Sequence, residues 1–180
     1  MISSDLKAKL KKIKLIISDV DGILTDGTIF IGDGVELKQF SVEDGAGAAF
    51  SRLAGIPIAL ISGRFSKSTE IRAKEMKIQH CYQGCLDKLK PFYEICKFYE
   101  VKPSEVAYVG DGLIDIPIME KVDISITVPD AHPYVKKLAV YETKIPGGRG
   151  ALREVVEWIL HAQERHSEIL DEMRKNIYKA

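Results

Sequence analysis

Residues 15–27 read LIISDVDGILTDG, an apolar run that ends abruptly in acidic residues and glycine. A continuous apolar run of this length is typical of a strand covered on both faces, as in a parallel sheet. Similar runs occur at three more places along the chain. The four predicted strands span residues 13–18, 57–61, 105–109 and 122–128.

Between these strands, apolar residues recur at three- and four-residue spacing, which indicates amphipathic helices. The predicted helices span residues 46–54, 66–77, 87–99 and 113–120. Because strands and helices alternate, the sequence predicts an α/β fold with a doubly wound, Rossmann-like parallel sheet. One segment breaks the alternation: residues 28–40, with glycines at 32 and 34, predict a β-hairpin inserted after the first strand.

The remaining segments indicate one domain. Residues 148–166 predict a closing helix, and a polar tail continues to residue 180, so the C-terminal helix and tail together span 148–180. The intervals between the candidate site residues are filled by the hairpin and the predicted strands and helices, which leaves no room for a cap domain. We therefore expect residues 1–180 to form a single domain, a length at which folding buries roughly 70% of the unfolded chain's surface.

The composition narrows the class of partner. The chain has 26 basic and 26 acidic side chains, so no net field attracts a polyanion, and nucleic acid or an acidic membrane is not expected as the main partner. Its three cysteines lack zinc-site spacing and indicate a reducing compartment. No apolar run near the N-terminus is long enough for a signal peptide or a membrane span. We expect a cytoplasmic protein with a small-molecule substrate.

Polar residues follow three of the predicted strands. Asp19 and Asp21 follow the first, Ser62 follows the second, and Asp111 and Asp115 follow the third. Ligands of open parallel sheets bind beyond the carboxyl ends of the strands. Carboxylates crowded there repel one another unless a cation binds, and an all-oxygen ligand set suits Mg²⁺. Glycine amides and a serine hydroxyl suit an anion, so the pattern indicates a phosphate with magnesium.

The pair Asp19 and Asp21 suits phosphoryl transfer. A carboxylate can attack phosphorus to form an aspartyl-phosphate that water later hydrolyses. The attack needs a metal to screen the charge and a second acid to protonate the leaving alcohol and then activate water. Lys88 can balance the charge on the transferring group, with Lys90 as the alternative.

Together these residues resemble the four motifs of the haloacid dehalogenase superfamily of phosphatases. The motifs are residues 19–27, 62–64, Lys88 and 110–115. Within the superfamily the chain is similar to members without a cap domain that hydrolyse 3-deoxy-D-manno-octulosonate 8-phosphate, a phosphorylated acid sugar of lipopolysaccharide synthesis. The likeness runs from about residue 15 to residue 160 and includes residues 40–45, 63–67, 82–84, 130–133 and 147–154.

The resemblance implies a role for each site residue. Asp19 is the nucleophile and Asp21 the general acid and base, while Ser62 and Lys88 hold the phosphate. Mg²⁺ is held by Asp19, the backbone carbonyl of Asp21, and Asp111, and Asp115 orients the metal's ligands. Substrate contacts are implied for Ser41, Val42, Glu43, Asp44, Gly45, Arg64 and Arg72.

Two alternatives stay open at this stage. Glu43 and Ala49 stand where family members usually carry arginine, so a nine-carbon sugar 9-phosphate of the sialic acid kind is the alternative substrate. A phospho-acceptor receiver is the alternative of another class, since it also uses acids, a hydroxyl and a lysine on a doubly wound sheet. Receivers place the acceptor mid-chain after an earlier acidic pair, and the position of Asp19 on the first strand argues against one.

The stretch 64–77 is strongly basic, and a solvated helix face is the default interpretation. Arg64 and Arg72 are eight residues apart, roughly on one side of the predicted helix, and we expect them to bind a sugar carboxylate. Lys67 and Arg149 remain open between substrate contact and a structural role.

The predicted hairpin carries more apolar side chains than an isolated two-stranded ribbon can bury. These side chains are Ile29, Phe30, Ile31, Val35, Leu37 and Phe40. Packing several hairpins around a symmetry axis would cover them and place each hairpin near a neighbour's crevice. We therefore expect a homotetramer, as the resemblance to relatives without a cap domain also implies.

Overall fold

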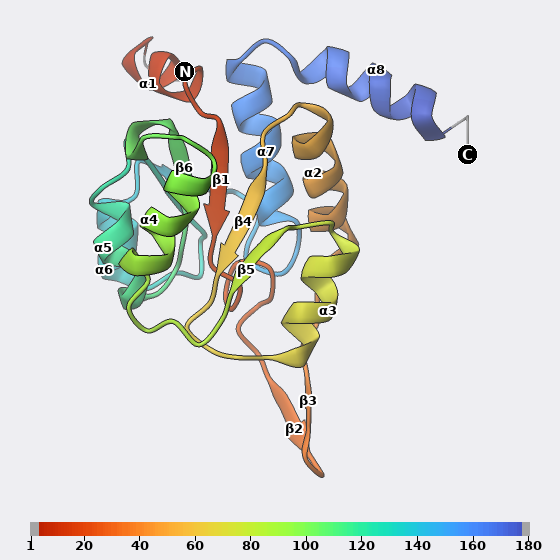
Figure 1. The fold of residues 1–180 in the computed structure, drawn as a ribbon, viewed down its shortest axis with the longest axis vertical. Helices are drawn as coiled ribbons and strands as arrows, with labels where there is room; N and C mark the ends of the chain where they lie inside the picture. The colour runs from red at the N-terminus through yellow and green to blue at the C-terminus, as the bar shows by residue number, and fades with distance from the viewer. Residues whose placement is uncertain (1–3, 178–180) are drawn as a thin grey trace.

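The computed structural model describes residues 4–177 and confirms the α/β class (Figure 1). Six strands form one sheet in the order β5-β4-β1-β6-β7-β8, and every neighbouring pair is parallel. The strands are β1 (Leu15–Ser18), β4 (Ile58–Ile61), β5 (His80–Tyr82), β6 (Val106–Val109), β7 (Ile124–Thr127) and β8 (Tyr141–Glu142). The central strands are buried along their whole length, which explains their continuous apolar character.

Helices cover both faces of the sheet. They are α1 (Ser4–Leu10), α2 (Val42–Leu53), α3 (Lys67–Glu75), α4 (Leu89–Phe98), α5 (Ile116–Met119), α6 (Pro133–Leu138), α7 (Ala151–Ala162) and α8 (His166–Ile177), with 3₁₀ turns η1 (Pro103–Glu105) and η2 (Leu113–Asp115). Leu15 and Ile17 pack with α4, α5 and α6, whereas Ile16 packs with α2 and α7. Alternate side chains of one strand thus enter two separate cores.

The strands that the sequence analysis missed are short and lie at the two edges of the sheet. Strands β5 and β8 have three and two residues and no apolar run. The helix predicted over 113–120 is instead η2 followed by α5, with Pro117 in the first turn of the new helix, where proline is favoured. None of the helices in the described part of the chain has the length and apolar character that crossing a bilayer requires.

The prediction of a polar tail after residue 166 was wrong, because residues 166–177 form α8. The chain turns through Glu164, which has a φ of 61°, and then starts the new helix. Ile169 is 2% exposed and belongs to the core beside α2 and α7. Ile169 is the one residue of α8 in the buried core among the described side chains, and such a weak apolar pattern explains why the sequence analysis missed this helix.

The predicted hairpin forms a separate two-stranded sheet of β2 (Phe30–Gly32) and β3 (Val35–Leu37). Its turn has positive φ at Asp33 and Gly34, the geometry that a tight hairpin turn requires. Figure 1 shows the hairpin projecting from the body of the molecule, below the edge where the strands end. Between β1 and β4 the chain adds just this hairpin and α2.

The loop 22–27, which joins Asp21 to the hairpin, lies directly against Gly147 and Gly148. The amide of Gly148 donates to the carbonyl of Ile23 at 2.9 Å. A Cβ atom on Gly147 would lie 1.9 Å from the carbonyl oxygen of Gly22, closer than any two such atoms can approach. Glycine at 147 therefore lets the two loops touch, and the position of the loop after Asp21 depends on it.

We predict that Gly147→Ala lowers the free energy of unfolding by about 1–3 kcal/mol, because the added methyl group forces the two backbones apart. Urea unfolding, followed by the fluorescence of Trp158, measures the change. Gly32→Ala is the matched control, since nothing lies within 4 Å of its Cβ position. Equal midpoints for the two variants would contradict the predicted close contact.

Candidate active site

Three strands end at one edge of the sheet, and a predicted site residue follows each. Asp19 follows β1, Ser62 follows β4, and Asp111 lies two residues beyond β6. The amide of Asp19 donates to the carbonyl of Val109 at 2.8 Å, and the amide of Ser62 donates to the carbonyl of Tyr82 at 2.8 Å. Backbone pairing thus continues past the strands and holds the start of each loop in place.

Three carboxylates converge on one lysine at this edge. Carboxylate oxygens of Asp19, Asp111 and Asp115 all lie within 4.8 Å of one another. The Nζ atom of Lys88 lies 2.8 Å from Asp19 Oδ2 and 2.7 Å from Asp115 Oδ1. Lys90, the alternative from the sequence, is exposed on α4. One ammonium faces three carboxylates, so an oxygen-lined excess of negative charge remains, and this donor set fits a hard divalent cation such as Mg²⁺.

The electrostatics of this cluster show how costly it is without further positive charge. Burial, and then the nearby Asp115, raise the pKa of Asp19 to about 7. The same two causes raise the pKa of Asp111 to about 6. Burial by itself would lower the pKa of Lys88, but the carboxylates of Asp19 and Asp115 raise it. Lys88 is therefore charged, and the carboxylates compete for protons in the absence of a cation.

Both carboxylate oxygens of Asp115 accept hydrogen bonds from other residues of the protein. Its Oδ1 atom accepts from Lys88 and from the hydroxyl of Tyr108 at 2.6 Å. Its Oδ2 atom accepts from the backbone amides of Asp111 at 3.1 Å and Gly112 at 2.9 Å. This geometry fits a residue that fixes the Asp111 loop and Lys88. The sequence analysis missed Tyr108, because a tyrosine within a buried strand carries no signal that its hydroxyl faces an acid.

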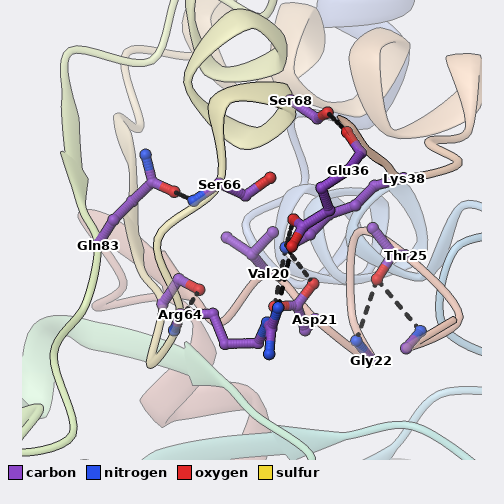
Figure 2. A network of polar contacts seen from close by, with 12 residues as sticks. Val20, Asp21, Gly22, Thr25, Glu36, Lys38, Arg64, Ser66, Ser68 and Gln83 are labelled. Carbon is purple, nitrogen blue, oxygen red and sulfur yellow. Dashed lines mark hydrogen bonds and ion pairs between the residues drawn. The ribbon is translucent and has the colours of Figure 1, made fainter. Parts of the chain in front are cut away.

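The Asp21 carboxylate faces Lys38, in the segment just after the hairpin (Figure 2). Lys38, just beyond β3, places its Nζ atom 2.6 Å from Asp21 Oδ1 and 2.9 Å from Oδ2. The sequence analysis missed Lys38 as well. The available signal was the strand alternation, which puts Glu36 and Lys38 on the opposite face from Val35 and Leu37.

Ser62 is fully buried at the end of β4. Its Oγ atom accepts from the backbone amide of Arg64 at 3.3 Å. Beside it, a Cβ on Gly63 would lie 2.7 Å from Ile114 Cδ1, so glycine leaves room for the facing loop. The turn holds a hydroxyl beside backbone amides, a combination that suits an anion.

Arg64 and Arg72 do not share a helix face, because α3 begins at Lys67 and Arg64 lies in the preceding turn. This corrects the arrangement expected from the sequence. Arg64 Nη2 lies 2.9 Å from Glu36 Oε2 on the hairpin. Arg72 Nη2 donates to the carbonyl of Ser41 at 2.8 Å. The two arginines thus contact different elements, the hairpin and the start of α2.

Residues 41–45, which precede the helix predicted over 46–54, are the cap and first turn of α2. The Ser41 side chain caps the helix by accepting from the amide of Glu43 at 3.2 Å. Val42 is 78% exposed, and the Glu43 carboxylate pairs with Arg153 of α7. Gly45 and Gly47, both in the first half of α2, obscured the helix start in the sequence.

The Asp44 side chain is 1% exposed and points into the protein. Its Oδ1 atom accepts from the amides of Leu152 at 3.0 Å and Arg153 at 3.3 Å. Helix α7 starts at Gly150, which has no side chain to cap it, so Asp44 of α2 performs that function. This places the Asp44 carboxylate in the α2–α7 contact.

The comparisons with known proteins agree with this geometry. Residues 58–150 match the model of the haloacid dehalogenase-like hydrolase family. A 3-deoxy-D-manno-octulosonate 8-phosphate phosphatase of Escherichia coli K12 is 46% identical over 168 residues, which cover 93% of this chain and 89% of that protein. The chain belongs to the haloacid dehalogenase-like hydrolases. The resemblance inferred from the motifs is confirmed, and it favours a hydrolase over a receiver module.

Solved structures of haloacid dehalogenase-like hydrolases share the fold. The phosphatase of the same kind from Yersinia pestis has a TM-score of 0.90 and 44% identity, and the match covers 92% of this chain and 90% of that one. The Moraxella catarrhalis phosphatase, in complex with magnesium, phosphate and the sugar acid KDO, has a TM-score of 0.91 and 38% identity, covering 96% and 99%. As a member of this hydrolase family, the chain is a phosphoric monoester hydrolase.

The raised pKa values of Asp19 and Asp111 predict a pH-dependent effect of Mg²⁺ on stability. In the metal-free folded protein these carboxyls keep protons up to about pH 7 and 6, above the value of 3.8 of an unperturbed aspartate. Stability of the metal-free protein should therefore fall as pH rises through this range. Mg²⁺ favours the charged forms, so its stabilising effect should be larger at about pH 8 than at about pH 5.5.

Melting temperatures of chelator-treated and Mg²⁺-saturated protein across this pH range test the prediction. Asp111→Asn is the informative variant, since it removes one carboxylate and should lose most of the Mg²⁺ effect at the higher pH. An Mg²⁺ effect of the same size at both ends of the range would contradict the competition between protons and metal.

Proposed function

We propose that this hydrolase removes the phosphate of 3-deoxy-D-manno-octulosonate 8-phosphate, releasing the free sugar acid and inorganic phosphate. The observation that carries the proposal is the buried contact of Asp19 with Lys88 beside Asp111 and Asp115. Relatives that match nearly the whole chain bear the name of this phosphatase, and one was solved with magnesium, phosphate and the sugar acid. On the same proposal, the enzyme acts in the cytoplasm, in the synthesis of lipopolysaccharide.

In the first step Asp19 attacks phosphorus. A bond forms between an Asp19 carboxylate oxygen and phosphorus while the bond from phosphorus to the sugar oxygen breaks. Asp21 gives its proton to that leaving oxygen, and the sugar leaves as an alcohol. Lys88 holds the attacking carboxylate on one side, and with Ser62 it contacts the phosphate oxygens.

In the second step water hydrolyses the aspartyl-phosphate. Asp21, now a carboxylate, takes a proton from water as the water oxygen bonds to phosphorus. The bond between phosphorus and Asp19 breaks, phosphate leaves, and both aspartates return to their first state. Asp19, Asp111 and the backbone carbonyl of Asp21 would hold Mg²⁺, and Asp115 would keep the Asp111 loop in position. The ion would neutralise charge on the nucleophile and the phosphate.

We assign the sugar end to the elements beside Arg64. Arg64 is half exposed and paired with Glu36, so a substrate carboxylate can exchange with that partner. Ser41, Val42, Glu43 and Gly45 present the exposed start of α2, while Asp44 and Arg72 support this turn from within. A nine-carbon sugar 9-phosphate carries the same carboxylate and is the competing substrate.

We also propose that four copies assemble through the hairpin, and that each copy of residues 1–180 is one catalytic domain. Phe30, Ile31, Val35 and Leu37 are each more than half exposed, and Phe65 beside them is 69% exposed. Monomeric proteins seldom expose large apolar side chains in one continuous patch. A neighbouring subunit would cover this surface and narrow the open crevice.

We predict that Asp19→Asn abolishes phosphate release, since an amide does not attack phosphorus. Asp21→Asn should lower kcat by about a hundredfold or more, the usual effect of losing a general acid and base. The assay measures phosphate released from the eight-carbon acid sugar phosphate, its nine-carbon competitor and a neutral sugar phosphate at saturating Mg²⁺. Asp171→Asn, on the exposed face of α8, is the control.

Preference for the nine-carbon ester would replace the proposed substrate, and preference for the neutral sugar phosphate would contradict the acid-sugar class. A loss of less than about tenfold in both active-site variants would contradict the mechanism.

For the assembly, we predict that the wild type has the mass of four subunits in light scattering at micromolar concentration. The double variant Phe30→Glu/Ile31→Lys should dissociate, because charged side chains in the apolar contact cannot be buried unpaired. Its melting temperature, followed at Trp158, shows that the domain still folds. A monomeric wild type would contradict the proposal.

A further inference from the structure

Lys38 is a buried ammonium that the phosphatase mechanism does not yet use. Its side chain is 1% exposed, although it belongs to the segment just after the projecting hairpin. Burying a lysine is costly unless its charge is paired. Its close partner is Asp21, held through both carboxylate oxygens, and Glu36 Oε1 lies 3.9 Å away as a second anion.

Asp21 in turn depends on Lys38 for the position of its carboxylate. Among the contacts of the described residues, the Asp21 carboxylate receives hydrogen bonds just from Lys38. The hairpin is not hydrogen-bonded to the six-stranded sheet, so the sheet does not orient this acid as it orients Asp19. The direction of the Asp21 side chain is therefore set by Lys38, which belongs to the hairpin segment and not to the six-stranded sheet.

The hairpin is itself fixed near Lys38 by Glu36. Glu36 Oε2 pairs with Arg64 at 2.9 Å, and the backbone carbonyl of Glu36 accepts from the Ser68 hydroxyl at 3.2 Å (Figure 2). Its Oε1 atom is buried and lies 3.9 Å from the Lys38 ammonium. Glu36 thus links the loop after Ser62 to the residue that holds Asp21.

We infer that Lys38 is a positioning residue of the phosphatase: its ammonium aims the Asp21 carboxyl at the leaving oxygen, and Glu36 holds Lys38 in place. This rests on the proposed role of Asp21 as the general acid and base. Lys38 acts through Asp21 and need not touch the phosphate. Its loss should therefore reduce kcat with little effect on KM.

The leaving group of the ester provides the sharpest test. Aryl phosphates need no sugar recognition, so the test remains readable even if the proposed sugar is wrong. p-Nitrophenyl phosphate has a good leaving group that needs little protonation, whereas phenyl phosphate depends more on the acid. We expect Lys38→Met to lower kcat by about tenfold with p-nitrophenyl phosphate and by about a hundredfold with phenyl phosphate.

Three further variants separate positioning from a structural effect. Lys38→Arg keeps the charge and should recover most of the activity with both esters. Lys97→Met, on the exposed side of α4, should leave both rates unchanged. Adding Lys38→Met to Asp21→Asn should cause no further loss, because a residue that acts through Asp21 has nothing left to position.

Melting temperatures followed at Trp158 confirm that each variant is folded, and Lys38→Gln replaces Lys38→Met if the latter is unfolded at the assay temperature. Equal loss with both esters, an effect confined to KM, or a full additional loss in the Asp21→Asn background would each overturn the inference. A wild type that hydrolyses the aryl esters but not the acid sugar phosphate would contradict the proposed substrate and leave the role of Lys38 open to the same measurement.

Discussion

The contact between Lys88 and the carboxylates of Asp19 and Asp115 is the interaction on which the site depends. Three acids crowded around one ammonium, two of them buried, are unfavourable by themselves, and this cost raises the pKa values of Asp19 and Asp111. Backbone pairing with the sheet holds the start of each loop, so the acids cannot move apart to relieve the repulsion. The repulsion between these carboxylates makes the site attract a divalent cation beside Asp19, the proposed nucleophile.

The two aspartates that we propose as catalytic are supported in different ways. Asp19 is fixed by strand pairing with Val109 and by buried contacts of the core. Asp21, two residues later, is held by Lys38, outside the sheet. A nucleophile benefits from a rigid position, whereas an acid and base must serve a leaving sugar oxygen and then a water molecule. Because Asp21 is held by Lys38 of the hairpin segment, the hairpin, and any neighbour that packs on it, can influence the proposed acid and base without disturbing Asp19.

Several polar residues near the site hold other parts of the protein in place and are not available to a ligand. Asp44 caps α7 from the neighbouring helix, and Tyr108 donates its hydroxyl to Asp115. Arg72 supports the start of α2 through the carbonyl of Ser41. Each of these contacts satisfies a buried polar group that would otherwise be costly. The candidate site therefore consists of a few exposed groups and a larger set of buried partners that orient them.

The sequence by itself determined the fold class, the four central strands, the hairpin and the convergence of Asp19, Ser62, Asp111 and Asp115 at one edge. These features follow from local apolar runs and from the rule that parallel strands end together, and both can be recognised in short segments. The family also followed, because its motifs are short and occur in a fixed order.

Only the tertiary structure decided which partners these residues have. The contacts of Lys38 with Asp21, of Tyr108 with Asp115 and of Asp44 with α7 join segments brought together by packing. The separation of Arg64 from α3 and the helix in place of the polar tail have the same origin, since weak local preferences were overridden by contacts with distant elements. A side chain's charge can be recognised from sequence, but its direction and partner depend on what the folded chain places opposite it.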